Sequence, residues 1–314
     1  MESTNNVTEF VLLELTENPK MQKIVFAVFL FIYIISMVGN LLILITITAN
    51  SLLGSPMYFF LAYLSFIEAC YASVNNLKLI RDSLHEKKTI LFNGYHPFQW
   101  MYGPRFGGHF FGGVEVILLR VMAYDQYVAI CKPLHYATIM NWKVCMLLGG
   151  VSWMGGFLHA TIQLLFIIPL PFCGPNVIDH FMCDLSPLLN LACTDTHILG
   201  LFVASNSGSI CLLNFLLLLV SYVVILHSLK THSLEGRHKA LSTCVSHITE
   251  VACSLFPAYL CTRDLQQIYL LISIDKAVAV FYTMINLMLN PVIYTLRNSQ
   301  MKTAIRKLFS RKII

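Results

Sequence analysis

The sequence predicts an all-α membrane protein, a bundle of seven transmembrane helices followed by a short amphipathic cytoplasmic helix. Of the 314 residues, 57% are hydrophobic and only 12% are charged, and the mean hydropathy is +0.69. Soluble domains carry about a quarter charged residues, so this chain has too little polar surface to cover a globule in water. Its apolar runs reach about 20 residues or more, the length that crosses the core of a bilayer.

Seven apolar segments separated by polar breaks make up most of the chain. The alternation typical of a β-barrel is not seen, and in lipid the backbone must then satisfy its hydrogen bonds within helices. We expect one receptor-sized domain, with an N-terminal segment 1–23, a helix bundle 24–296 and a tail 297–314. The predicted spans are roughly 24–49, 56–80, 106–130, 143–169, 198–228, 240–262 and 269–296.

Basic residues are concentrated on one side of the predicted bundle, whereas acidic residues dominate the N-terminal segment and the long loop 170–197. The positive-inside rule therefore predicts a multi-pass plasma-membrane protein with an extracellular N-terminus and a cytosolic C-terminus. The net charge of +5 comes largely from these loops and the tail, so it does not indicate a nucleic-acid partner. The basic residues on the predicted cytosolic side are Lys132, Lys143, Lys230, Arg237, Lys239, Arg297, Lys302, Arg306, Lys307, Arg311 and Lys312.

The N-terminal segment has no basic start and no apolar stretch, so it does not match a cleavable signal peptide. We expect the first span to direct membrane insertion instead. The triplet Asn6-Val7-Thr8 matches the acceptor sequence for N-glycosylation. Because the charge distribution predicts that this segment is outside the cell, Asn6 is the predicted glycosylation site.

An amphipathic pattern follows the last span. Met301, Ile305 and Leu308 recur at helical spacing, and basic residues stand beside them. This pattern favours a short helix lying on the inner leaflet of the membrane. A frayed basic tail is the alternative.

Short motifs occur in order along the spans. They are Gly39-Asn40 in the first, Pro56-Met57-Tyr58-Phe59-Phe60-Leu61 in the second, and Met122-Ala123-Tyr124-Asp125 with Tyr127-Val128-Ala129-Ile130-Cys131 in the third. Lys132-Pro133-Leu134-His135-Tyr136 follows, then Ser221-Tyr222 in the fifth, Ser242-Thr243-Cys244 and Ser246-His247 in the sixth, and Asn290-Pro291 with Ile293-Tyr294 in the seventh. In these motifs the chain resembles rhodopsin-like receptors and, among them, vertebrate odorant receptors, over nearly its whole length.

The resemblance implies a receptor that binds small volatile organic ligands and activates a stimulatory, olfactory-type G protein to raise cyclic AMP. It needs no cofactor. The ligand pocket would be small and mostly apolar with a few hydrogen-bonding groups, the usual chemistry of a small-molecule site. Ordinary helix packing is the alternative at each position, above all for the two glycines. The implied ligand-binding residues are His109, Gly112, Gly113, Val203, Asn206, Ser207, Ile210, Ala258, Tyr259 and Thr262.

The resemblance also implies an activation switch and an internal polar cavity that holds sodium. Polar residues within a bilayer are costly unless they face one another or water. The alternative for the two glutamates is that they are protonated and hydrogen-bonded. The implied switch residues are Asp125, Gln126, Tyr127, Tyr222, His247, Asn290, Pro291 and Tyr294. The implied cavity residues are Asn40, Glu68, Glu115, Asn286 and Asn290.

Three cysteines lie together in loop 170–197, on the oxidising side of the membrane. The resemblance implies a disulfide between Cys173 and Cys193. It also implies that Cys183 pairs with a cysteine near the third span, but Tyr95 stands at that position, so Cys183 is expected to be free. His180, Cys183 and Asp184 match a metal-binding pattern proposed in odorant receptors, and a solvated or buried loop is the alternative.

Other departures from the family affect signalling. The Asp-Arg-Tyr triad is Asp125-Gln126-Tyr127 here, segment 96–108 is longer and irregular, and the sequence after Pro257 loses the usual pattern. The alternative function is therefore a receptor-fold protein with impaired folding or signalling. A transporter or channel would require internal repeats or a charged pathway, and neither is seen. The chain has no set of nucleophile, base and oxyanion donor, so it is predicted not to be an enzyme.

Overall fold

A computed structural model describes most of the seven predicted spans and the tail. The described residues are 9–12, 19–82, 89–91, 104–167, 170, 177–178, 192–194, 196–228, 241, 244–245, 248–249, 280 and 284–310.

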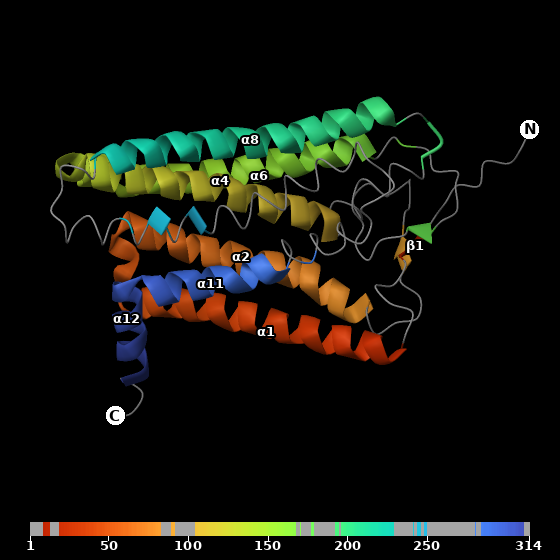
Figure 1. The fold of residues 1–314 in the computed structure, drawn as a ribbon, viewed down its shortest axis with the longest axis horizontal. Coiled ribbons are helices and arrows are strands. Elements are labelled where there is room, and N and C mark those ends of the chain that lie inside the picture. The colour runs from red at the N-terminus through yellow and green to blue at the C-terminus, as the bar shows by residue number, and fades with distance from the viewer. Residues whose placement is uncertain are drawn as a thin grey trace, which may run out of the picture.

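Five long helices lie side by side and form an elongated bundle (Figure 1). They are α1 (Pro19–Ala49), α2 (Pro56–Asp82), α4 (Pro104–Cys131), α6 (Trp142–Ile167) and α8 (His197–Ser228). A proline opens three of them, where its fixed φ suits the first turn and its missing N–H costs nothing. The Asn141 side chain caps α6 by accepting a hydrogen bond from the Val144 amide at 3.1 Å. These helices confirm the first five predicted spans to within a few residues.

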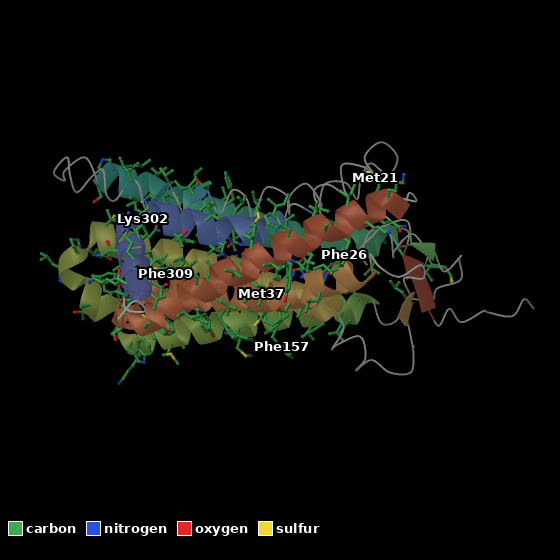
Figure 2. The ribbon with its side chains drawn as sticks, turned by 90° about the horizontal axis from the view of Figure 1, so that it is seen from below. Met21, Phe26, Met37, Phe157, Lys302 and Phe309 are labelled. Atoms are coloured by element: carbon green, nitrogen blue, oxygen red, sulfur yellow. The ribbon has the colours of Figure 1, made fainter. Side chains whose placement is uncertain are left out.

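The outer surface of these helices is apolar. Phe31 of α1, Leu147 and Met154 of α6 are each more than 60% exposed, and Figure 2 shows side chains standing out along the bundle. Such large exposed apolar faces would be insoluble in water, so their solvent is lipid. Among the described residues, four helices are long and apolar enough to cross a membrane: Lys20–Ala49, Pro56–Leu77, Phe106–Cys131 and Trp142–Phe166. Leu212–Ser228 of α8 is a shorter apolar stretch.

The last two predicted spans are described in part. Residues 241, 244–245 and 248–249 are helical and belong to the sixth. In the seventh, a π-helical turn at residues 284–285 leads into α11 (Asn286–Arg297), which contacts α1 and α2. The rest of these two spans lies outside the described residues.

The tail forms α12 (Ser299–Ser310), which runs across the end of the bundle, as Figure 1 shows. Met301 and Ala304 are buried against the bundle, whereas Lys302, Arg306 and Lys307 are exposed. The amphipathic helix predicted from the apolar spacing is therefore confirmed. We call this end of the bundle the α12 end.

A small three-stranded sheet lies at the opposite end, which we call the sheet end (Figure 1). Its central strand β1 (Glu9–Leu12) pairs antiparallel with β2 (Thr89–Leu91) and parallel with β3 (Val177–Ile178). This sheet is not predicted from the sequence. Strands of two to four residues carry too little pattern to be recognised, and the pairing joins segments that are far apart in the chain.

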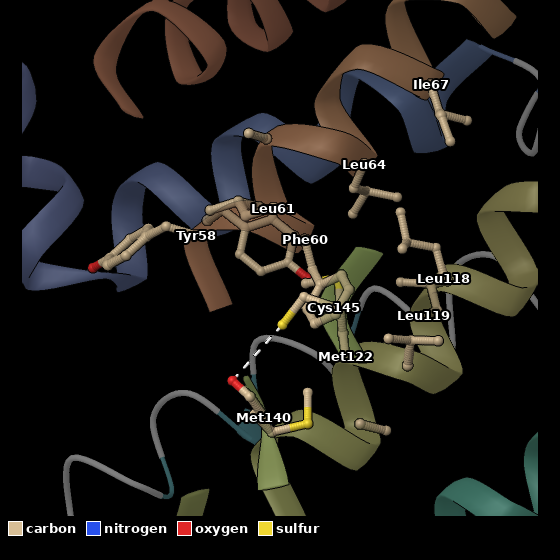
Figure 3. Close-up of a cluster of buried hydrophobic side chains, with 14 of the residues drawn as sticks. Tyr58, Phe60, Leu61, Leu64, Ile67, Leu118, Leu119, Met122, Met140 and Cys145 are labelled. Carbon is tan, nitrogen blue, oxygen red and sulfur yellow. Dashed lines mark hydrogen bonds between the residues drawn. The ribbon is translucent and has the colours of Figure 1, made fainter. Parts of the chain in front are cut away.

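The buried core lies chiefly between α2 and α4 (Figure 3). Phe60 and Leu64 of α2 pack against Leu118 and Met122 of α4. Short helices connect the long ones: η1 (Leu52–Gly54) joins α1 to α2, and η2 (Pro133–His135) with α5 (Tyr136–Ile139) joins α4 to α6. Just after this second connection, in the first turn of α6, the buried Cys145 thiol lies 3.9 Å from the Met140 carbonyl oxygen.

Candidate functional site

Pro291 lies inside α11, where its ring leaves the Leu287 carbonyl without a helical N–H donor. Ser36 of α1 donates its hydroxyl to that carbonyl at 3.0 Å. Gly39, nearly one turn further along α1, permits the close approach, because a Cβ there would lie 2.8 Å from Pro291 Cβ. Pro291, a predicted switch residue, is therefore held against α1.

The five residues of the predicted polar cavity are all buried, on α1, α2, α4 and α11. Asn290 donates to Glu68 Oε1 at 2.7 Å, and Asn286 donates to Glu115 Oε1 at 3.4 Å. The Asn40 amide has no hydrogen-bond partner among the described residues. Two amide side chains of α11 thus donate hydrogen bonds to two buried carboxyl groups, one on α2 and one on α4. Buried polar groups generally have such hydrogen-bond partners.

At the α12 end, the triad of α4 makes two contacts with other elements. Tyr136 of α5 donates its hydroxyl to Asp125 Oδ1 at 2.8 Å. Tyr222 of α8 donates to Gln126 Oε1 at 3.4 Å, a long hydrogen bond between two buried side chains. Tyr127 is half-buried against the same core. The predicted switch residues of the third and fifth spans are therefore in contact.

Tyr136 belongs to the connection between α4 and α6, outside the spans. Burial raises the pKa of its phenol, and the adjacent Asp125 carboxylate raises that pKa further. The phenol therefore stays protonated and remains a donor to Asp125 at any physiological pH. This contact was not predicted, although Tyr136 belongs to a motif that follows the third span.

Three of the predicted ligand residues lie in the outer half of α4. The His109 ring meets the ring of His159 of α6 edge-on, with centroids 5.9 Å apart. A Cβ on Gly113 would be 3.1 Å from Gly156 Cα of α6, whereas one on Gly112 would meet only Tyr71 of α2, at 3.8 Å. For Gly113 this close approach supports the alternative of helix packing.

The remaining predicted ligand residues are described in part. Asn206 is half-buried on α8. Val203, Ser207 and Ile210 lie on the same helix, but their side chains are not among those described. Ala258, Tyr259 and Thr262 lie outside the described residues, as does His247 of the predicted switch. Tyr294 of the switch is buried and packs against the core.

Predictions for the sheet end fall mostly outside the described residues. Cys193 is disulfide-bonded. Its predicted partner Cys173 is not among the described residues, and neither are Asn6, Tyr95 or the candidate metal ligands His180, Cys183 and Asp184.

Several buried polar residues were missed. Ser36, Asn75, Asn76 and Asn214 are each at least nine-tenths buried within helices, and His159 is partly buried. A polar residue inside an apolar span is itself a signal of function, so the amides and the histidine could have been found from the sequence. Ser36 could not, because serine occurs throughout such spans.

A helical bundle with a lipid-facing surface and a buried polar interior is the architecture of a multi-helix membrane protein, and it agrees with the seven-span receptor class predicted from the sequence. The olfactory receptor family model matches residues 29–312. Human olfactory receptor 4A47 is 55% identical, covering 100% of this chain and 99% of its own length. Human olfactory receptor 4S2 is 52% identical, over 100% and 98%, and mouse olfactory receptor 4B13 is 50% identical, over 99% of both. The chain belongs to the olfactory receptor family; it is an odorant receptor and not an enzyme.

Proposed function

We propose that this receptor binds small volatile organic ligands in the sheet-end half of the bundle and activates a stimulatory, olfactory-type G protein that raises cyclic AMP. Membership of the olfactory receptor family carries the proposal. G-protein coupling is consistent with that family. No finding favours the alternative of impaired folding or signalling.

The ligand site is proposed to comprise the predicted residues of the third, fifth and sixth spans. The observations that support it are the contact of the His109 ring with His159 of α6 and the half-buried Asn206 on α8, which are polar side chains within largely apolar helices. Phe106 of α4 stacks on Phe110 and meets Phe157 of α6 edge-on, so apolar rings fill the contact between these two helices in the same half of the bundle. Few polar groups in an apolar surround are typical of small-molecule sites.

The proposed orientation has the α12 end in the cytosol. Exposed basic residues on α12 and on the connection between α4 and α6 support it, because basic residues near the ends of spans stay on the cytosolic side. The sheet end, with β1 and the disulfide-bonded Cys193, would then be extracellular. The proposed location is the plasma membrane, with glycosylation at Asn6 and a disulfide between Cys173 and Cys193.

The proposed switch couples ligand binding to the α12 end through α11. Its polar centre consists of Glu68 and Glu115 with their amide partners Asn290 and Asn286, beside Asn40. Carboxylate and amide oxygens are suitable ligands for sodium or for internal water. Movement of α11 on ligand binding would change these contacts and those of Gln126 and Tyr222 at the α12 end.

The test is expression of the N-terminally tagged receptor, with surface labelling of intact cells and a cyclic-AMP assay against a broad odorant panel. We expect surface labelling without permeabilisation and a dose-dependent rise in cyclic AMP for at least one odorant. A fusion of the receptor with a constitutively active stimulatory G protein controls for the downstream assay. Receptor that labels at the surface but responds to no odorant of any chemical class would contradict the proposal.

A further inference from the structure

Among the described residues, strands β2 and β3 are joined only through the N-terminal strand β1. The strand order is β2-β1-β3, so β2 and β3 do not pair with each other. Val11 of β1 has a Cα partner on both sides, Thr89 in β2 and Val177 in β3. The backbone at this one residue therefore takes part in both pairings.

The three strands belong to parts of the chain that are far apart. In chain order β1 precedes α1, β2 precedes α4, and β3 precedes α8. Both α4 and α8 carry residues of the proposed ligand site, and the sheet lies at the end of the bundle where these two helices begin (Figure 1). β1 thus holds together the two connections that lead into helices of that site.

The pairings within this sheet are short. β2 has three residues and β3 has two, and each has β1 as its partner strand. A ribbon of two short strands is at best marginally stable in water. Elements with few backbone hydrogen bonds open locally at a small fraction of the free energy of global unfolding. Loss of β1 would therefore release β2 and β3 together, while the long helices stay folded.

Residues 13–18 connect β1 to the first turn of α1. A segment of this length reaches about 20 Å at most, so a released β1 stays near the strands that it left. Pairing again is then an intramolecular step with a high effective concentration. α1 itself is anchored to α11 by the hydrogen bond from Ser36 to the Leu287 carbonyl. Opening and closing of β1 is therefore reversible and leaves the bundle intact.

We propose that β1 is a reversible clasp, which closes the sheet end of the receptor when it is paired and lets small molecules enter and leave the bundle when it opens. The inference rests on the proposed function and adds to it a control of ligand exchange by the N-terminal segment. β1 is not one of the elements that supply the proposed ligand contacts. Its opening therefore changes the rates of association and dissociation by the same factor and leaves the affinity unchanged.

The first test is hydrogen exchange of the full receptor in nanodiscs, comparing Val11→Pro with the parent. Proline lacks the N–H and is excluded from central strands. We expect exchange to become about tenfold faster or more, the change for one lost hydrogen bond, in both 89–91 and 177–178. Val11→Ile and Thr4→Pro, which lies outside β1, should match the parent. Faster exchange in only one of the two segments, or in neither, would overturn the inference. If Val11→Pro is not expressed, Val11→Gly should give a smaller change in the same direction.

The second test measures access without any odorant. Gly112→Cys introduces a thiol in the sheet-end half of α4, where the nearest atom to its Cβ is 3.8 Å away, on Tyr71. Its rate of modification by a small, membrane-impermeant methanethiosulfonate is followed by peptide mass spectrometry. Adding Val11→Pro should raise that rate about tenfold or more, again equivalent to one lost hydrogen bond, whereas adding Thr4→Pro should not. An unchanged rate beside faster exchange of both strands would overturn the control of access.

The cyclic-AMP assay then separates the clasp from the proposed function. For any odorant that activates the parent, Val11→Pro should leave the EC50 within about threefold, less than the loss of one hydrogen bond would cause. An EC50 raised about tenfold or more would mean that β1 contributes to affinity, and would overturn the clasp. Silence of the parent toward every odorant would contradict the proposed function, while a faster thiol modification in Val11→Pro would still support the clasp.

Discussion

Ser36 donates a hydrogen bond at 3.0 Å to the carbonyl oxygen of Leu287, the carbonyl that Pro291 leaves without a donor in α11. In a bilayer no water replaces a missing backbone partner, so a side chain from a neighbouring helix must do so. A hydroxyl on α1 thereby stabilises the interruption in α11, next to the Asn290–Glu68 contact.

Ser36→Ala should lower the free energy of unfolding by about 1 kcal/mol, because it leaves the Leu287 carbonyl unpaired. The measurement is thermal or denaturant unfolding of the purified receptor. In a Pro291→Ala background the restored Ala N–H supplies the donor, so the same serine substitution should cost much less. Equal losses in the two backgrounds would mean that the hydroxyl does not act through Leu287.

Gln126→Arg should increase the maximal odorant-driven cyclic-AMP response at matched surface level. Glutamine can accept from Tyr222 but has neither the charge nor the bidentate geometry of arginine, which in the family contacts the G protein. The parent receptor lacks the resting ion pair that an arginine at position 126 would form with Asp125, and this loss would raise its basal activity. Basal and maximal output are therefore measured together. We expect the larger effect on the maximal cyclic-AMP response. A shift of the receptor toward its active state produces no signal when that state binds the G protein weakly.

The control for this prediction is Tyr95→Cys, which restores the partner expected for Cys183. Parent and Gln126→Arg receptors that reach the surface and respond equally would show that position 126 does not limit signalling. Receptors that reach the surface only after Tyr95→Cys is added would make the missing disulfide the larger defect.

Gly156→Ala should destabilise the bundle by about 1–3 kcal/mol, because its methyl group has no room between α4 and α6. A Cβ there would be 2.7 Å from the Phe110 carbonyl oxygen and 2.8 Å from the Val114 nitrogen, and backbone atoms cannot rotate away. Gly150→Ala, on the same helix with nothing within 4 Å of its Cβ, is the matched control and should be neutral or slightly stabilising. Unfolding curves that coincide for the two variants would refute the packing argument.

Tyr58→Phe should loosen α12 without unfolding the bundle. The Tyr58 hydroxyl donates to Gln300 Oε1 at 2.6 Å and lies 3.4 Å from Asn298 Oδ1. The same Asn298 oxygen caps α12 by accepting a hydrogen bond from the Met301 amide at 3.1 Å. Hydrogen exchange should become faster in residues 299–310 and remain unchanged in α2. Asn298→Ala, which removes the cap at a cost of about 1 kcal/mol, should have the larger effect. Unchanged exchange in both variants would contradict this anchoring.

Peptide mapping under non-reducing conditions should find Cys193 joined to Cys173. Cys193 is disulfide-bonded, and the family pairing assigns the partner. Cys183 should then react with an impermeant thiol reagent on intact cells. A peptide in which Cys183 is bonded to Cys193 or Cys173 would disprove the pairing, and the Cys183→Ser variant would distinguish native pairing from exchange during digestion.

The first five spans, α12 and the positions of the buried polar residues Asn40, Glu68 and Glu115 could be predicted from the sequence. Each depends on local information. Hydropathy over about 20 residues identifies a span, and helical spacing of apolar residues identifies the buried side of α12, where Met301 and Ala304 lie. The short motifs also led to the family that the comparisons show.

Only the tertiary structure decided which of these residues meet. The contacts of Ser36 with Leu287, Tyr58 with Gln300 and His109 with His159 each join separate helices, and each depends on the rotation and depth of both helices. A sequence determines which face of a helix is polar but not which neighbour that face meets. The sheet at the other end follows the same rule, because β1 is stabilised by hydrogen bonds to strands far along the chain rather than by its own four residues.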